Sequence, residues 1–103
     1  MDNMEEYIAI SSKDGRLSSP EEPGAKLITF SMEGEQIVGV LDEVTPTKDT
    51  NSLLKWFSLK GISRLYVSTI SPLMYQALTS LGIIIMQKDE VEDDPFYNRF
   101  IFD

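Results

Sequence analysis

The sequence contains no cysteine and no histidine. Without cysteine there are no disulfide bonds, thiolate nucleophiles or cysteine-ligated metal clusters. Without histidine the chain lacks the side chain that most often ligates transition metals and acts as a general base near neutral pH. The remaining carboxylates, lysines and tyrosines form no recognisable pair of nucleophile and base. We therefore expect a protein that is not an enzyme.

Basic residues are also scarce. The 103 residues include 9 Lys and Arg against 17 Asp and Glu, which gives a formal net charge of -8. The basic residues are spread singly along the chain and form no cluster. Such a surface repels the phosphate backbone, so we expect no nucleic-acid partner.

Long hydrophobic runs are missing as well. No stretch approaches the roughly 20 apolar residues of a membrane span, and the first residues lack the basic and apolar regions of a signal peptide. We expect no membrane association and a cytoplasmic location. A chain of 103 residues is long enough for one core, which predicts a single domain over residues 1–103.

Short apolar runs bounded by turn residues predict three strands in the first half of the chain, at residues 7–11, 26–32 and 36–41. The turn at residues 33–35 predicts that the last two pair antiparallel. A helix around residues 53–59 follows, with Asp49 or Thr50 as its N-cap and Gly61 as its end.

The segment 61–87 is the organising unit, because it predicts strand, turn, helix and strand in succession. Apolar strands are expected at residues 65–67 and 83–86. Ser71 is the expected N-cap of the intervening helix, Pro72 its first residue and Gly82 its end. Such a unit makes its two strands parallel and leaves a crevice at the carboxyl end of the first strand.

The end of the chain divides into an acidic and an aromatic part. Residues 87–94 are dominated by acids and predict a solvated loop. Residues 95–103 contain three phenylalanines and predict an edge strand or a contact in a homodimer or with a protein partner.

The order of these elements, with a long loop after the first strand, resembles a ribonuclease H-like topology. The resemblance implies an α/β domain in two or three layers, with a mixed five-stranded sheet and flanking helices. Ribonuclease H enzymes need acids on the first strand, the first helix and the fourth strand to hold two metal ions. The corresponding residues 7–11, 53–57 and 67–69 contain no carboxylate, so nuclease activity is excluded.

Residues 7–86 also resemble the dinitrogenase iron-molybdenum cofactor biosynthesis accessory family, whose small domains carry metal-cluster precursors. The likeness rests on residues 8–16 (IAISSKDGR), residues 24–25 and 28–30 after the loop, and residues 61–62 and 81–83 around the central unit. It implies the iron-molybdenum cofactor or a precursor as ligand. Many members have Ser-x-His-Phe-Gly where residues 19–24 read SPEEPG, so the metal-ligating imidazole is absent.

The candidate binding site combines the loop after the first strand with the turn before the second helix. Its residues are Ser12, Lys13, Gly15, Arg16, Gly24, Ser68, Thr69 and Ser71. The hydroxyls and free backbone N–H groups of the turn could bind an anion, and the basic side chains could add positive charge. The alternative is an ordinary helix cap and an ordinary turn. Glu21 and Glu22 are interpreted as solvated acids, and we assign no metal site.

Two functions remain open from the sequence. The first is a non-enzymatic carrier of a small ligand or metal cluster, based on the family resemblance and the crevice. The second is a protein–protein interaction module that has lost metal-cluster binding, based on the missing histidine and cysteine and the aromatic C-terminal segment.

Overall fold

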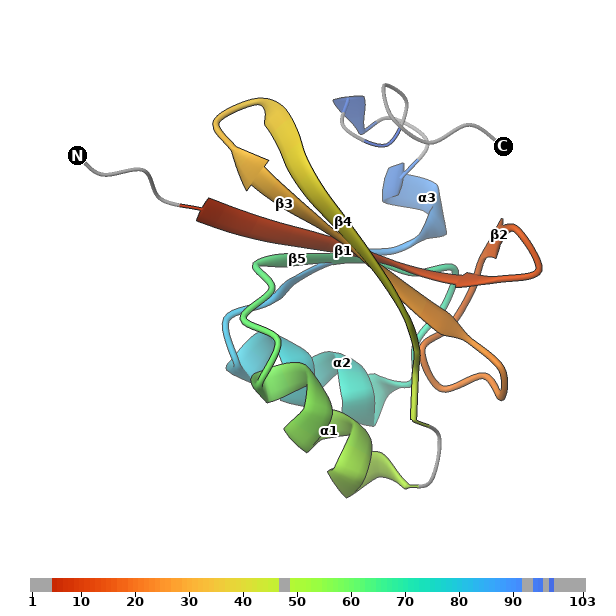
Figure 1. Cartoon of the computed structure of the whole chain (residues 1–103). Coiled ribbons are helices and arrows are strands. Elements are labelled where there is room, and N and C mark those ends of the chain that lie inside the picture. Colours follow the sequence, from red (N-terminus) through yellow and green to blue (C-terminus); the bar gives the residue numbers. More distant parts are fainter. Residues whose placement is uncertain (1–4, 47–48, 92–93, 96, 98–103) are drawn as a thin grey trace.

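The computed structural model of the protein describes residues 5–46, 49–91, 94–95 and 97. They form one sheet of six strands with three helices (Figure 1). The strands are β1 (Glu5–Lys13), β2 (Arg16–Leu17), β3 (Lys26–Glu33), β4 (Gln36–Val44), β5 (Arg64–Tyr66) and β6 (Ile84–Met86). The helices are α1 (Thr50–Ser58), α2 (Pro72–Ser80) and α3 (Lys88–Val91).

The sheet is mixed, with the strand order β4-β3-β1-β5-β6 and with β2 paired to β1. Strands β4, β3 and β1 are antiparallel, whereas β1, β5 and β6 are parallel. The expected pairings of β3 with β4 and of β5 with β6 are confirmed. The expected count of five strands is wrong by the two-residue β2, which folds back on β1 after the turn at Asp14 and Gly15.

Helices α1 and α2 cover one face of the sheet (Figure 1). Because successive residues of a strand point to opposite faces, every second residue of the buried strands meets these helices. The resulting core cluster joins the helix residues Leu53, Phe57, Met74 and Leu78 to the strand residues Ala9, Leu27, Leu65 and Ile85, among others.

The opposite face carries a second core cluster and α3 (Figure 1). Val91 of α3 packs there against the strand residues Ile8, Ile10, Phe30, Met32 and Tyr66. The interpretation of residues 87–94 as a solvated loop is therefore wrong in part: residues 88–90 are exposed, but residues 88–91 form a helix, Val91 is 2% exposed and Asp94 is 8% exposed. Val91, an apolar residue within the acidic run, anchors the segment to the sheet.

Both longer helices begin where local signals predict. The side chain of Asp49 accepts a hydrogen bond from the backbone N–H of Ser52 at 2.8 Å and caps α1. Ser71 caps α2 in the same way through Met74, and Pro72 follows at the start of the helix. The predictions for these two starts are confirmed.

The predicted aromatic segment 95–103 lies mostly outside the described residues. Of its described part, Tyr97 stacks on Tyr66 with 6.0 Å between the ring centroids. None of the helices in the described part of the chain is long and apolar enough to cross a membrane.

Candidate functional site

The fold brings the loop after β1 and the turn after β5 together at the carboxyl ends of these two parallel strands. Strands β1 and β5 are parallel neighbours, with Ile8 opposite Arg64 and Ile10 opposite Tyr66. The carboxyl ends of adjacent parallel strands lie together, and ligands of open α/β sheets bind at that edge. The two segments also touch, because the backbone N–H of Ser68 donates to the carbonyl of Ser18 at 3.1 Å.

The loop after β1 is tied down at its first turn. The backbone N–H of Ser18 donates to the carbonyl of Ser11 at 2.8 Å, and the hydroxyls of these two buried serines lie 3.2 Å apart. A second turn follows, in which the hydroxyl of Ser19 accepts a hydrogen bond from the backbone N–H of Glu21 at 3.1 Å. These local bonds fix the backbone from which the Glu21 side chain projects.

The Glu21 carboxylate lies at the N-terminus of α2. One oxygen accepts a hydrogen bond from the backbone N–H of Ser71 at 3.0 Å, and the other accepts one from the Ser71 hydroxyl at 2.9 Å. A helix N-terminus favours negative charge because its first N–H groups and its dipole point at the ligand. The Ser71 donors, which the sequence predicts to bind an anionic ligand, are occupied in this structure by a carboxylate of the same chain.

Among the other expected site residues, Lys13 at the end of β1 and Gly24 in the loop that follows lie close to each other. Ser12 and Lys13 end β1, where Lys13 forms an ion pair with Glu22 at 3.5 Å. Gly24 adopts a positive φ of 85° beside Lys13, and a Cβ there would lie 3.5 Å from Lys13 Cε. The structure thus joins Lys13 to the end of the same loop that carries Glu21.

The remaining expected residues are more peripheral. Gly15 is exposed on the turn between β1 and β2, Arg16 is exposed at the start of β2, and Thr69 is exposed between Ser68 and Ser71. Glu21 was not among the expected binding residues, because its partner is 50 residues away in the sequence. The helix start at Ser71 was the available signal, since such a start attracts a carboxylate from elsewhere in the fold.

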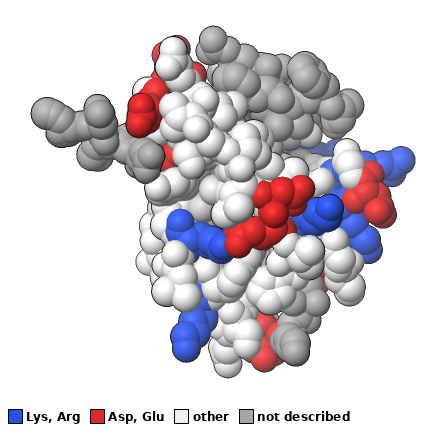
Figure 2. All heavy atoms as spheres, in the orientation of Figure 1, with Lys and Arg blue, Asp and Glu red and all other residues white. Residues whose placement is uncertain are grey.

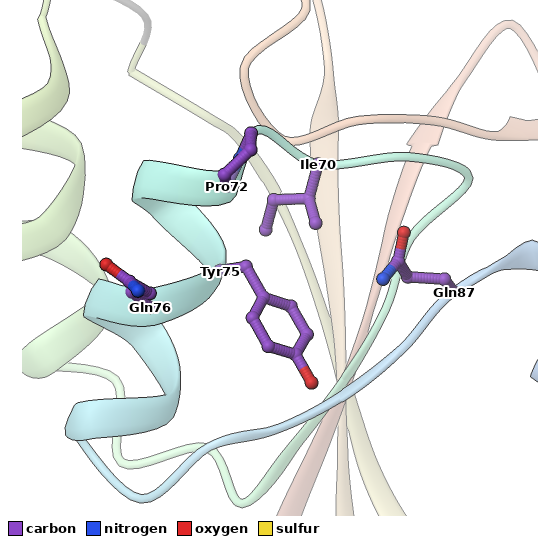
Figure 3. A pocket seen from close by; sticks show the side chains of 5 residues that line it. All are labelled: Ile70, Pro72, Tyr75, Gln76 and Gln87. Carbon is purple, nitrogen blue, oxygen red and sulfur yellow. The ribbon is translucent and has the colours of Figure 1, made fainter.

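Two hollows adjoin this contact. One, of about 220 Å³, is lined by Glu21 and by the first turn of α1 through Asp49, Thr50 and Leu53. The second, of about 380 Å³, is lined by Ile70, Pro72, Tyr75, Gln76 and Gln87 (Figure 3). There the Tyr75 ring projects from α2 below Ile70, toward the ribbon that leads to Gln87, while Gln76 points away from this space. The lining has no charged residue, so this hollow suits an uncharged or apolar group.

The described residues contain no group of three or more carboxylates that could hold a metal ion. The donors at Ser71 are N–H and O–H groups, which bind anionic oxygen atoms and cannot ligate a cation through their hydrogens. The Ser71 donors therefore suit an anionic oxygen atom, such as those of the Glu21 carboxylate.

A second polar cluster lies buried under α3. The Tyr66 hydroxyl donates to Asp94 at 2.6 Å, the backbone N–H of Tyr97 donates to the same carboxylate oxygen at 2.9 Å, and Arg64 donates to the Tyr66 oxygen at 3.3 Å. Burial, and after it the hydrogen bond to Asp94, raises the pKa of Tyr66 to about 12. Because Tyr66 is fully buried, this cluster holds Asp94 and Tyr97 against the sheet.

Comparison with known proteins identifies relatives in structure. No protein-family model and no curated protein matches the sequence. The crystal structure of the protein PH0822 is similar with a TM-score of 0.66 and 18% identity, over 77% of this chain and 73% of that one. A proposed dinitrogenase (MJ0327) from Methanocaldococcus jannaschii is similar with a TM-score of 0.62 and 19% identity, over 85% of this chain and 78% of that one. At these identities the likeness shows a shared compact α/β fold.

Proposed function

We propose that the protein is a non-enzymatic accessory domain that binds a small anionic ligand at the N-terminus of α2. The observation that carries the proposal is the pair of hydrogen bonds from Ser71 to the Glu21 carboxylate. These two hydrogen bonds support the proposal, because they show donors already placed to bind two anionic oxygen atoms. Binding exchanges the Glu21 carboxylate for an anionic group of the ligand, and the adjoining hollows accommodate the rest of it.

The fold supports the link to cofactor biosynthesis proteins. The strand order β4-β3-β1-β5-β6, antiparallel on one side of β1 and parallel on the other, is consistent with the ribonuclease H-like type. The similarity to the proposed dinitrogenase points to a related accessory role. Direct coordination of an iron-molybdenum cluster does not fit the residues present, because the chain offers neither thiolate nor imidazole. We therefore assign an oxyanion, and not a bound metal, to the turn at Ser71.

Titration calorimetry with molybdate and with sulfate tests this function. Glu21→Ala removes the competing carboxylate and leaves the Ser71 donors in place, so it should bind either anion several-fold more tightly than the wild-type protein. Glu22→Ala is the matched control, because it removes the neighbouring acid, which pairs with Lys13 and not with Ser71. Equal affinity in the wild type and in both variants contradicts the proposal.

The second candidate is a protein–protein interaction module that has lost its ligand. The same contact favours it, since Glu21 already satisfies the donors that a ligand would need. The two functions differ in the calorimetric result. Failure of Glu21→Ala to bind molybdate or sulfate favours the interaction module over the ligand carrier.

A further inference from the structure

Strand β4 forms a long edge of the sheet. It is nine residues long and pairs with β3 alone among the described strands, whereas the opposite edge strand, β6, has three residues. An edge strand presents a row of backbone N–H and C=O groups that another strand can pair with. Length makes β4 the stronger template of the two edges.

The edge is apolar and carries few of the features that prevent pairing. Val38, Val40, Leu41 and Val44 are 50%, 61%, 53% and 69% exposed, respectively. Natural edges are usually protected by lysine, proline or a bulge. Strand β4 contains no lysine and no proline. The pairing of β4 with β3 has a register shift opposite Ser31 and Met32, but from Gly39 to Val44 the pairing is regular.

Charge is distributed unevenly along this strand. Asp42 and Glu43 lie near its carboxyl end, whereas residues 36–41 are uncharged. Glu43 forms an ion pair with Lys60, which follows α1. In Figure 1 β4 crosses in front of the sheet, and Figure 2 shows acidic and basic atoms together near the centre of this face, with uncharged atoms above them and further acidic atoms at the upper left. Within β4 the acids are therefore confined to the carboxyl half, and the next acid, Glu35, lies in the turn before the strand.

This asymmetry decides how two copies can pair. Parallel pairing places Asp42 and Glu43 of one chain against the same acids of the other, and like charges opposite each other are destabilising. Antiparallel pairing about Val40 places Asp42 opposite Val38 and Glu43 opposite Ile37, so no acid faces an acid. It also brings the exposed Val40 side chains together across the symmetry axis.

We propose that β4 pairs antiparallel with β4 of a second copy of this chain, with a two-fold axis near Val40. The interface uses the same surface on both chains, as in most homodimers, and extends the two sheets into one. It involves neither Ser71 nor Glu21, so it is independent of the proposed anion site. Because each chain carries a net charge of -8, salt should strengthen the association.

The absence of cysteine makes a direct test practical, since one introduced cysteine is the only thiol in the chain. At the axis, Cα atoms of opposed residues lie about 4.5–5.5 Å apart, within the range that a disulfide spans. Under mild oxidation Val40→Cys should form a disulfide dimer far more readily than Val44→Cys. The Val44 positions of the two chains are eight residues apart along the paired strands, or about 26 Å.

Val44→Cys is a matched control, because it changes the same residue type on the same strand at a more exposed position. Equal cross-linking of the two variants overturns the proposal, because it indicates random collision. Light scattering after size exclusion at about 0.15 M salt gives a second readout. The wild type should have twice the chain mass and Val40→Lys the chain mass of 11.7 kDa. A wild-type protein at the single-chain mass at every concentration also overturns the proposal.

Discussion

Glu21 and Ser71 are joined by two hydrogen bonds, although 50 residues separate them in the sequence. The Ser71 hydroxyl has two roles, because it donates to Glu21 and accepts a hydrogen bond from the backbone N–H of Met74. One serine thus starts α2 and binds a carboxylate. The contact links the loop after β1 to the helix after β5, which is the place where a ligand of this fold is expected.

The first prediction concerns the stability that this contact provides. Glu21→Ala should lower the free energy of unfolding by about 1.5–3 kcal/mol, the usual range for a hydrogen bond to a charged group. Glu22→Ala removes only an ion pair at the surface and should cost less than about 1 kcal/mol. Urea unfolding measures both values. Equal losses in the two variants would show that the Ser71 contact contributes nothing beyond an ordinary surface acid.

The start of α1 gives a second prediction. Asp49→Ala removes the acceptor for the backbone N–H of Ser52 and should destabilise the protein by about 1 kcal/mol, as for other helix N-caps. Asp49→Asn keeps an acceptor oxygen and should cost far less. Thermal unfolding of the two variants checks this difference. A loss as large in Asp49→Asn as in Asp49→Ala would attribute the effect to charge and not to capping.

These two helix starts show which parts of the fold the sequence predicts well. Asp49, Ser71 and Pro72 act through hydrogen bonds and steric limits within one helical turn, so the sequence pattern contains the whole interaction. The turn at residues 33–35 is equally local, and the pairing of β3 with β4 follows from it.

The candidate site was harder to predict because it depends on contacts between distant segments. The meeting of the two loops follows from strand order, but the position of the Glu21 side chain follows from the turn at Ser19. Helix α3 was missed because acids dominate its sequence. Its start does carry a local signal, since the Glu90 side chain accepts a hydrogen bond from the backbone N–H of Gln87 in the manner of a capping box.

A third prediction follows from the cluster under α3. Asp94→Ala leaves the hydroxyl of buried Tyr66 without its carboxylate acceptor, which should cost about 1–3 kcal/mol. Once Tyr66→Phe has removed that hydroxyl, Asp94→Ala should cost less. A double-mutant cycle by urea unfolding measures this coupling. Additive losses would mean that the two side chains act independently.

The same tyrosine makes stability depend on alkaline pH. Its pKa is about 12 in the folded protein and near 10 in the unfolded chain, so the folded state keeps a proton that the unfolded state releases. The contribution of this group to stability is complete below about pH 10 and is lost as the pH rises toward 12. Tyr66→Phe removes this dependence while leaving Tyr7, Tyr75 and Tyr97 as internal controls. Urea unfolding at neutral pH and at about pH 11 should therefore show a larger loss of stability in the wild type than in Tyr66→Phe. Equal losses would assign the alkaline sensitivity to the other tyrosines or to the lysines.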